Sequence, residues 1–168
     1  MNHRRLLLAA LAILPIAMPF VAAGPAMAQN VNPTVAQPML PTEKMTIVTH
    51  DGRKLDFTVE MALTDDQQIT GLMFRKTVAP NTGMLFDWHQ PRDSNMWMRN
   101  TVAPLDMLFV DADGTIHHIA ENTVPQSLAV ISSDGPVRAT IEIAAGTAER
   151  LDIRVGDHVQ NRVFGNGG

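Results

Sequence analysis

Apolar and polar positions alternate along much of this chain from residue 45 onward. The clearest run places apolar side chains at every second position, at Leu55, Phe57, Val59 and Met61. This spacing predicts a strand over 53–61 with one solvent-facing side. Asp51-Gly52 precedes the strand and predicts a two-residue type I′ turn, which would join it to a first strand over 45–50.

A short helix is predicted after this hairpin. Thr64 is suited to cap it, and Gln67 follows at the spacing of a capping box. Asp65 and Asp66 would favour the positive N-terminal end. We expect the helix to end near Leu72, and Gly71 within it predicts a close backbone contact.

The remaining chain predicts further strands at residues 84–88, 95–101, 107–110, 115–124, 137–145 and 155–159, with a helical turn over 147–151. In 137–145 the apolar residues share one face, so we interpret Glu142 on the other face as solvated. Many short strands and two brief helices predict a mostly β fold: an antiparallel sandwich or a jelly-roll-like barrel with one or two short helices.

The first 28 residues have the pattern of an export signal, which is a basic start, an apolar run over 6–14 and the small-x-small sequence Ala26-Met27-Ala28. The alternative is an uncleaved membrane anchor. Pro15 and Pro19 interrupt the apolar stretch, which at roughly 18 residues is at the lower limit for spanning. We therefore expect a periplasmic or secreted protein with no stable membrane insertion after cleavage.

Cleavage after Ala28 would leave 168 − 28 = 140 residues, enough for one domain with a core of its own. Residues 29–44 predict a flexible Pro-containing tether, residues 45–163 a single β-rich domain, and residues 164–168 a flexible tail. The chain has 0 cysteines, so the fold has no disulfide.

The formal charge is −4, and it becomes 11 − 17 = −6 once Arg4 and Arg5 are removed. Because nucleic-acid binding requires clustered Lys and Arg, this charge opposes a nucleic-acid partner.

Several sequence blocks combine large apolar side chains with single polar residues: Gly71-Leu72-Met73-Phe74-Arg75, Gly83-Met84-Leu85-Phe86, Trp97-Met98-Arg99-Asn100-Thr101, Pro104-Leu105-Asp106, and Gly146 with Val155-Gly156-Asp157. In this order they resemble the domain of unknown function 192 family over about residues 45–159. The resemblance implies a β-rich, jelly-roll-like fold and implies no reaction, because the family has no established activity.

Five polar residues embedded in these blocks are candidate site residues: Arg75, Arg99, Asn100, Thr101 and Asp106. They could form a small pocket for a polar or anionic ligand, with guanidinium groups as paired donors. They could instead form an internal network in which Asp106 neutralises an arginine and Asn100 ties a loop to the backbone. We favour the network.

Met96 and Met98, with His89 close in sequence, raise the possibility of a Cu(I) site, since soft sulfur ligands select Cu(I). Methionine is also an ordinary filler of irregular cores, and we prefer that interpretation. We expect no other metal and no cofactor.

Trp97 should lie on the strand face opposite Met96 and Met98, so we expect a central strand buried on both faces. An exposed Trp97 would instead favour a stacking platform for sugars or peptides.

Enzyme motifs are lacking, because no serine has a G-x-S-x-G context and no Gly-rich phosphate loop occurs. We expect a noncatalytic binding or accessory module whose partner is a small molecule or an envelope protein. The alternative is a hydrolase-like enzyme acting on an envelope component, which would need converging carboxylates such as Glu121 and Asp106. Methionine-based Cu(I) binding is a third reading, and no feature specifies an oligomeric state.

Overall fold

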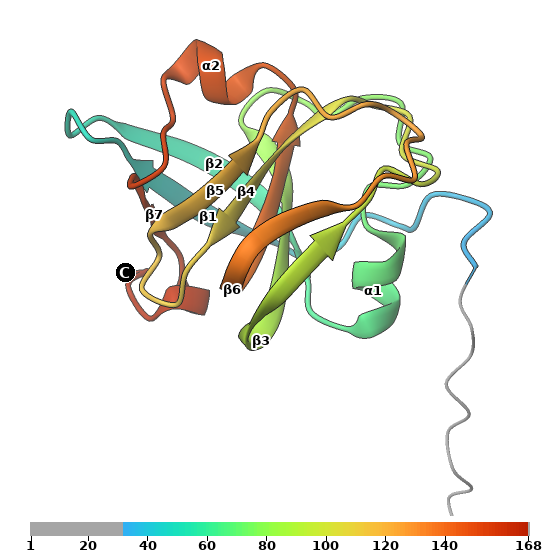
Figure 1. Ribbon diagram of the computed structural model, residues 1–168, viewed down its shortest axis with the longest axis horizontal. Helices are drawn as coiled ribbons and strands as arrows, with labels where there is room; N and C mark the ends of the chain where they lie inside the picture. The colour runs from blue at the N-terminus through green and yellow to red at the C-terminus, as the bar shows by residue number, and fades with distance from the viewer. Residues whose placement is uncertain (1–31, 168) are drawn as a thin grey trace, which may run out of the picture. The chain divides into compact units, whose positions relative to one another are not determined.

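A seven-stranded sheet forms most of the computed structural model, which describes residues 32–167 (Figure 1). The elements follow in the order β1 (Thr42–Val48), β2 (Lys54–Ala62), α1 (Asp65–Thr70), β3 (Thr82–Met96), β4 (Leu105–Val110), β5 (Ile116–Ala120), β6 (Ile131–Ala144), α2 (Thr147–Leu151), β7 (His158–Gln160) and the 3₁₀ turn Arg162–Phe164. Within the sheet the strand order is β5-β4-β6-β3-β2-β1-β7.

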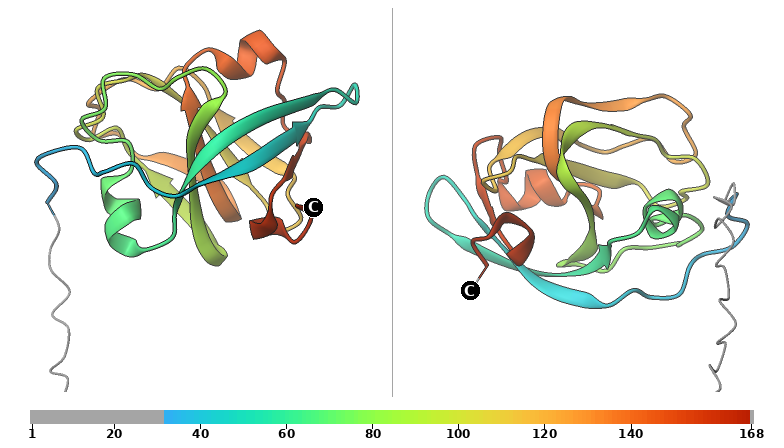
Figure 2. Two further views of the ribbon diagram at one scale, coloured as in Figure 1. Left: turned by 180° about the vertical axis from the view of Figure 1, so that it is seen from behind. Right: turned by 90° about the horizontal axis from the view of Figure 1, so that it is seen from below.

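The sheet curls until its two edge strands meet (Figure 2). Thr115, just before β5, forms an isolated bridge to His158 at the start of β7. Two backbone hydrogen bonds support this contact, from Val159 N–H to Gly114 O at 2.7 Å and from Ile116 N–H to Asp157 O at 2.9 Å. The predicted mostly β, barrel-like fold with two short helices is therefore confirmed.

One strand pair departs from the antiparallel prediction. β2 and β3 run parallel, whereas the other paired strands of the sheet are antiparallel. A parallel pair needs a crossover connection, and here α1 and residues 71–81 provide it. This crossover also places α1 beside the sheet, where the candidate site lies.

The first hairpin has the predicted strands but a different turn. Gly52 N–H donates to Thr49 O at 2.8 Å, and Thr49 N–H donates to Arg53 O. A type I′ turn requires positive φ at both central residues, but Gly52 has φ 83° and Asp51 is not among the positive-φ residues. The predicted two-residue type I′ loop is wrong, and the connection spans 49–53.

α1 begins as the sequence predicts. The Thr64 hydroxyl accepts from Gln67 N–H, and the Gln67 side chain accepts from Thr64 N–H, which completes the capping box. The helix ends at Thr70, two residues before the expected end. Gly71 follows with φ 48°, and a Cβ on it would lie 3.1 Å from Phe86 Cζ. The close backbone contact expected at Gly71 is thus with an aromatic ring of β3.

The sheet carries an apolar cluster on each face. The inner cluster fills the curl and includes Phe57, Leu85 and Ile141, with Ala148 of α2 closing one end. The outer cluster includes Met84, Phe86 and Met107 on the opposite face of β3 and β4. Leu72 and Met98, from the connections 63–81 and 97–104, cover part of this second face. β4, residues 83–87 of β3 and residues 139–143 of β6 are therefore buried on both sides.

The expected domain boundaries shift slightly at both ends of the described chain. β1 begins at Thr42, so residues 42–44 of the expected tether lie in the sheet. Gln37 Nε2 also donates to Gln67 O and Gly71 O. At the other end, Phe164 is buried and Asn166 donates to Val159 O.

The predicted signal sequence lies outside the described residues. Among residues 32–167, no helix has the length and apolar character needed to cross a membrane.

Candidate ligand-binding site

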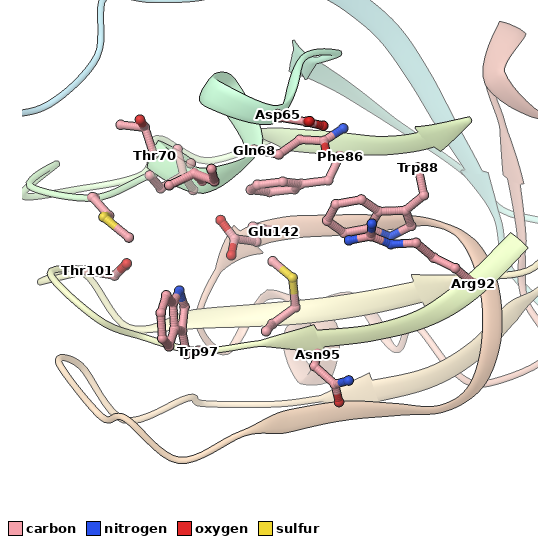
Figure 3. A pocket seen from close by; sticks show the side chains of 15 residues that line it. Asp65, Gln68, Thr70, Phe86, Trp88, Arg92, Asn95, Trp97, Thr101 and Glu142 are labelled. Carbon is pink, nitrogen blue, oxygen red and sulfur yellow. The ribbon is translucent and has the colours of Figure 1, made fainter. Parts of the chain in front are cut away.

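A cavity of about 390 Å³ opens between α1, the end of β3 and the outer face of β6 (Figure 3). Its volume falls in the range of small-molecule sites. The lining residues come from α1 and its C-terminal side, from both halves of β3, from the segment after β3, and from β6: Asp65, Gln68, Ile69, Thr70, Gly71, Leu72, Met73, Phe86, Trp88, Arg92, Asn95, Met96, Trp97, Thr101 and Glu142.

Two aromatic rings of β3 form one wall. The centroids of Phe86 and Trp88 are 5.9 Å apart with planes tilted by 30°. Gly71 packs against the Phe86 ring, and the Trp88 indole N–H donates to Thr140 Oγ1 at 3.2 Å. Arg92 lies over the Trp88 ring, with Cζ 4.2 Å from its centroid. These contacts with Gly71, Thr140 and Arg92 hold both rings in position.

Trp97 forms the opposite side of the cavity, and its position corrects the sequence interpretation. β3 ends at Met96, and Trp97 is 43% exposed, so it is not part of a strand buried on both faces. Arg99 stacks on it, with Cζ 4.1 Å from the ring centroid. The indole is therefore available to contact a ligand, which is the condition under which a stacking platform was expected.

Glu142 lies at the floor of the cavity, and its interpretation as a solvated residue is wrong. The residue is only 5% exposed. In the sheet it stands between Met84 of β3 and Met107 of β4, both fully buried. Figure 3 shows its carboxyl group in the space between Phe86 and Trp97. Because the connections 63–81 and 97–104 cover most of this face of β6, Glu142 is exposed only at the cavity.

The Glu142 carboxyl group has no hydrogen bond and no ion pair within residues 32–167, while its strand neighbour Thr140 bonds both Trp88 and Ser94. Burial raises the pKa of Glu142 from 4.5 to about 8. Removing an acid from water without a partner disfavours its charged form. A perturbed acid inside a cavity is a recognised mark of a functional site.

Four other carboxyl groups are buried in the described chain, and each has partners there. Glu60 pairs with Arg75, and Asp87 pairs with Arg138. Asp157 accepts from the backbone N–H groups of residues 50 and 154. Asp106 accepts from three backbone N–H groups. Glu142 is the exception among the five.

The structure does not gather the five predicted site residues in one pocket. Thr101 lines the cavity, whereas Arg99 stacks on Trp97 with its buried Nε lacking a partner among the described residues. Asn100 has φ 58° and points Nδ2 toward Met73 Sδ at 3.9 Å. Its backbone oxygen accepts from residue 74, which ties two loops together.

Asp106 and Arg75 serve different structural contacts. Asp106 is fully buried and receives N–H groups from Asn122, Gly146 and Ala148 at 2.9 to 3.1 Å, so it fixes the start of α2 instead of neutralising an arginine. The Arg75 guanidinium donates two hydrogen bonds to the Glu60 carboxylate, of 2.5 and 2.8 Å. This pair lines a second cavity of about 290 Å³.

The three residues of the copper hypothesis lie in different surroundings. Met96 lines the large cavity, whereas Met98 is fully buried and its sulfur accepts the Thr123 hydroxyl at 3.2 Å. His89 does not line that cavity, and its Nε2 is 2.9 Å from Leu63 O. Within residues 32–167, no group of three His, Cys, Asp or Glu side chains is arranged to hold a metal.

Sequence reasoning missed most of the cavity lining, including Asp65, Gln68, Phe86, Trp88, Arg92 and Glu142. One usable signal was the sequence Thr140-Ile141-Glu142-Ile143-Ala144, in which small or weakly polar residues flank the acid on its own face. A strand without strongly polar neighbours on either face is typical of the interior of a two-layered structure.

Together these features define a barrel-like β domain with a side cavity whose floor carries an unpaired carboxyl group. The chain belongs to the DUF192 family, described as "Uncharacterized ACR, COG1430", whose model matches residues 46–161.

Two solved structures are similar to this domain. One is a protein from Sinorhizobium meliloti 1021 described as a candidate transcription regulator. It is 44% identical, with a TM-score of 0.73, over 76% of this chain and 98% of that one. The other is a protein of unknown function from Novosphingobium aromaticivorans DSM 12444. It is 37% identical, with a TM-score of 0.71, over 79% of this chain and 94% of that one. A comparison with curated proteins found no match.

Proposed function

We propose that this protein is a noncatalytic module that binds a small molecule in the cavity above Glu142. The observation that carries the proposal is a 5% exposed carboxyl group without a partner among the described residues, at the floor of a cavity of about 390 Å³. A buried polar group is costly unless something hydrogen-bonds it. Since the other four buried carboxyl groups are satisfied inside the domain, Glu142 is the one suited to a ligand.

The walls of the cavity support binding of a compact, partly apolar molecule. Phe86, Trp88 and Trp97 present aromatic surface, and Thr101 and Gln68 add polar groups. Ligand sites commonly combine mostly apolar walls with a few placed polar groups. We also propose that the protein acts outside the cytoplasm, on the strength of the basic start, apolar run and small-x-small sequence at the N-terminus.

The tryptophans offer a direct test. The chain has 2 Trp and 0 Tyr, and both tryptophans line the cavity, so intrinsic fluorescence reports on this site. Titration with a chemically diverse fragment set should give saturable fluorescence changes. Amide chemical shifts should move near residues 70, 101 and 142, and Trp88→Phe and Trp97→Phe should each retain one reporter. Fragments that bind only elsewhere, or none that bind, would refute the proposal.

A hydrolase-like enzyme is the second candidate, and one observation favours it. A carboxyl group whose pKa is near 8 can act as a general acid at neutral pH, and Asp65 lines the same cavity as a second acid. The hydrolase hypothesis predicts that the protein hydrolyses fragments resembling glycosides or esters and that Glu142→Gln abolishes this hydrolysis. Binding without turnover supports the noncatalytic module.

The S. meliloti relative is described as a candidate transcription regulator. For the present chain we propose a function that does not involve nucleic acid. Its net charge is −4, and phosphate binding depends on clustered basic residues.

A further inference from the structure

The surroundings of Glu142 restrict the chemistry of a ligand. Neither flanking strand supplies a cation, because its sheet neighbours are Met84 and Met107. No Lys, Arg or His of the described chain forms an ion pair with the Glu142 carboxyl group. By contrast, the buried acids Glu60 and Asp87 each pair with an arginine. Among residues 32–167, a carboxylate in this place has neither a counter-charge nor a hydrogen-bond donor.

Two other charged residues line the cavity, and neither neutralises Glu142. Arg92 on β3 is exposed and stacks on Trp88. Asp65 on α1 is exposed and adds a second negative charge at the mouth. The segment after β3 carries Arg99, which stacks on Trp97 and is not a lining residue. The cavity therefore has two acids and a single base, and that base already contacts an aromatic ring.

We propose that the ligand of this cavity carries a protonated amine on an apolar body, with the ammonium group bound to Glu142 and the body held between Phe86 and Trp97. This inference rests on the proposed binding function. An ammonium group supplies the charge and the N–H donors that the buried carboxylate lacks. Aromatic faces attract a nearby cation through cation–π interactions, which aliphatic walls do not provide. Met73 and Met96 also line the cavity and add polarizable thioether groups.

Amine binding should be coupled to proton release. Because the pKa of Glu142 is raised to about 8, most of the free protein holds this carboxyl group protonated at neutral pH. An ammonium ligand selects the ionised form, so binding expels up to one proton. Its affinity should therefore increase about tenfold per pH unit below about pH 8 and level off above it.

A matched series of probes tests the inference: phenethylammonium, 2-phenylethanol and 3-phenylpropionate share one aromatic body and differ in charge. Tryptophan fluorescence should rank their affinities amine, alcohol, carboxylate at about pH 8, with a gap of about tenfold or more between amine and alcohol. Glu142→Gln should remove that gap and leave the alcohol within about threefold of its original affinity. Glu149→Gln, the same substitution at an exposed glutamate of α2 that does not line the cavity, serves as the matched control and should keep the gap.

Proton release gives a readout that needs no variant. Calorimetric titration of the unmodified protein with phenethylammonium, in two buffers of different ionisation enthalpy, should show up to one proton released near neutral pH. Equal affinity for amine and alcohol, or amine binding without proton release, would overturn the amine inference while leaving a ligand-binding cavity in place. If neither these probes nor the diverse fragment set binds the cavity, the proposed function itself falls.

Discussion

Asp106 and Glu142 are buried acids on neighbouring strands, and they have opposite surroundings. Asp106 is 0% exposed and receives three backbone N–H groups from the connection after β5 and from the start of α2. Glu142 is 5% exposed and receives none from the described chain. The region around Asp106 therefore satisfies its acid from within the domain, whereas the Glu142 carboxyl group borders the cavity and has no donor among the described residues.

The difference teaches how burial alone should be interpreted. A carboxylate that accepts several N–H groups is a structural device, because it satisfies loop and helix ends that would otherwise be orphaned. A carboxyl group that faces a cavity without donors lowers the stability of the folded state when it is charged. The contrast supports an architectural role for Asp106 and the binding role proposed for Glu142, and four measurements can break or sharpen it.

The largest effect is expected for Asp106→Ala. The substitution leaves the N–H groups of Asn122, Gly146 and Ala148 without an acceptor, and we expect a loss of about 3 to 5 kcal/mol in the free energy of unfolding. Denaturant titration measures it. Asp106→Asn keeps one acceptor oxygen and should lose less. A loss below about 1 kcal/mol would mean that this acid does not hold the region together.

The next effect is the pH dependence caused by Glu142. Burial raises the pKa of Glu142 from its ordinary value of 4.5 to about 8 in the folded protein, so between these values the native state holds a proton that the unfolded state has released. Stability must therefore fall as pH rises through this window and level off above about 8. Since each pKa unit corresponds to about 1.4 kcal/mol, the shift sets an upper limit of about 5 kcal/mol on this loss.

Glu142→Gln isolates this contribution because glutamine does not titrate. The difference in unfolding free energy between the variant and the original protein should increase in favour of the variant from about pH 5 to about pH 8. Denaturant titrations at several pH values measure it. Parallel pH profiles for the two proteins would show that Glu142 is not perturbed, and the contrast with Asp106 would lose its basis.

A smaller effect is expected for Trp97→Ala. Because Trp97 is 43% exposed, its truncation removes partial burial and the Arg99 stacking contact, for about 1 to 2 kcal/mol in all. Phe109→Ala, in the fully buried outer cluster, is the control and should lose about 3 to 5 kcal/mol. Equal losses in thermal or chemical unfolding would show that Trp97 is a core residue after all.

The sequence predicted the features that depend on local pattern. Alternation over 53–61 identified β2, and Thr64 with Gln67 identified the start of α1. Gly71 was expected to allow a close contact, and it packs on Phe86. The family blocks also indicated the correct fold, and two of them meet in the outer layer, where Gly71 contacts the Phe86 ring.

The sequence could not predict what covers the second face of the sheet. The covering connections 63–81 and 97–104 are largely irregular, so no periodicity marks them as a layer. Alternation tells which residues share a face but not whether that face meets solvent, which is why Glu142 was misread. Trp97 was misread for a related reason: the strand signal ran past Met96, where pairing with β6 stops at Ile131.

The smallest expected effect concerns Asp65, the other acid of the cavity. Asp65 is the first residue of α1, where a negative charge favours the positive end of a helix, and Asp65→Asn should lower stability by only about 0.5 kcal/mol. Its effect on amine affinity should also be small, because the exposed side chain is screened by water and salt. Fluorescence titration of phenethylammonium at low and high salt measures this. If Asp65→Asn weakens binding as strongly as Glu142→Gln does, recognition depends on the combined negative charge of the cavity instead of the buried carboxyl group alone.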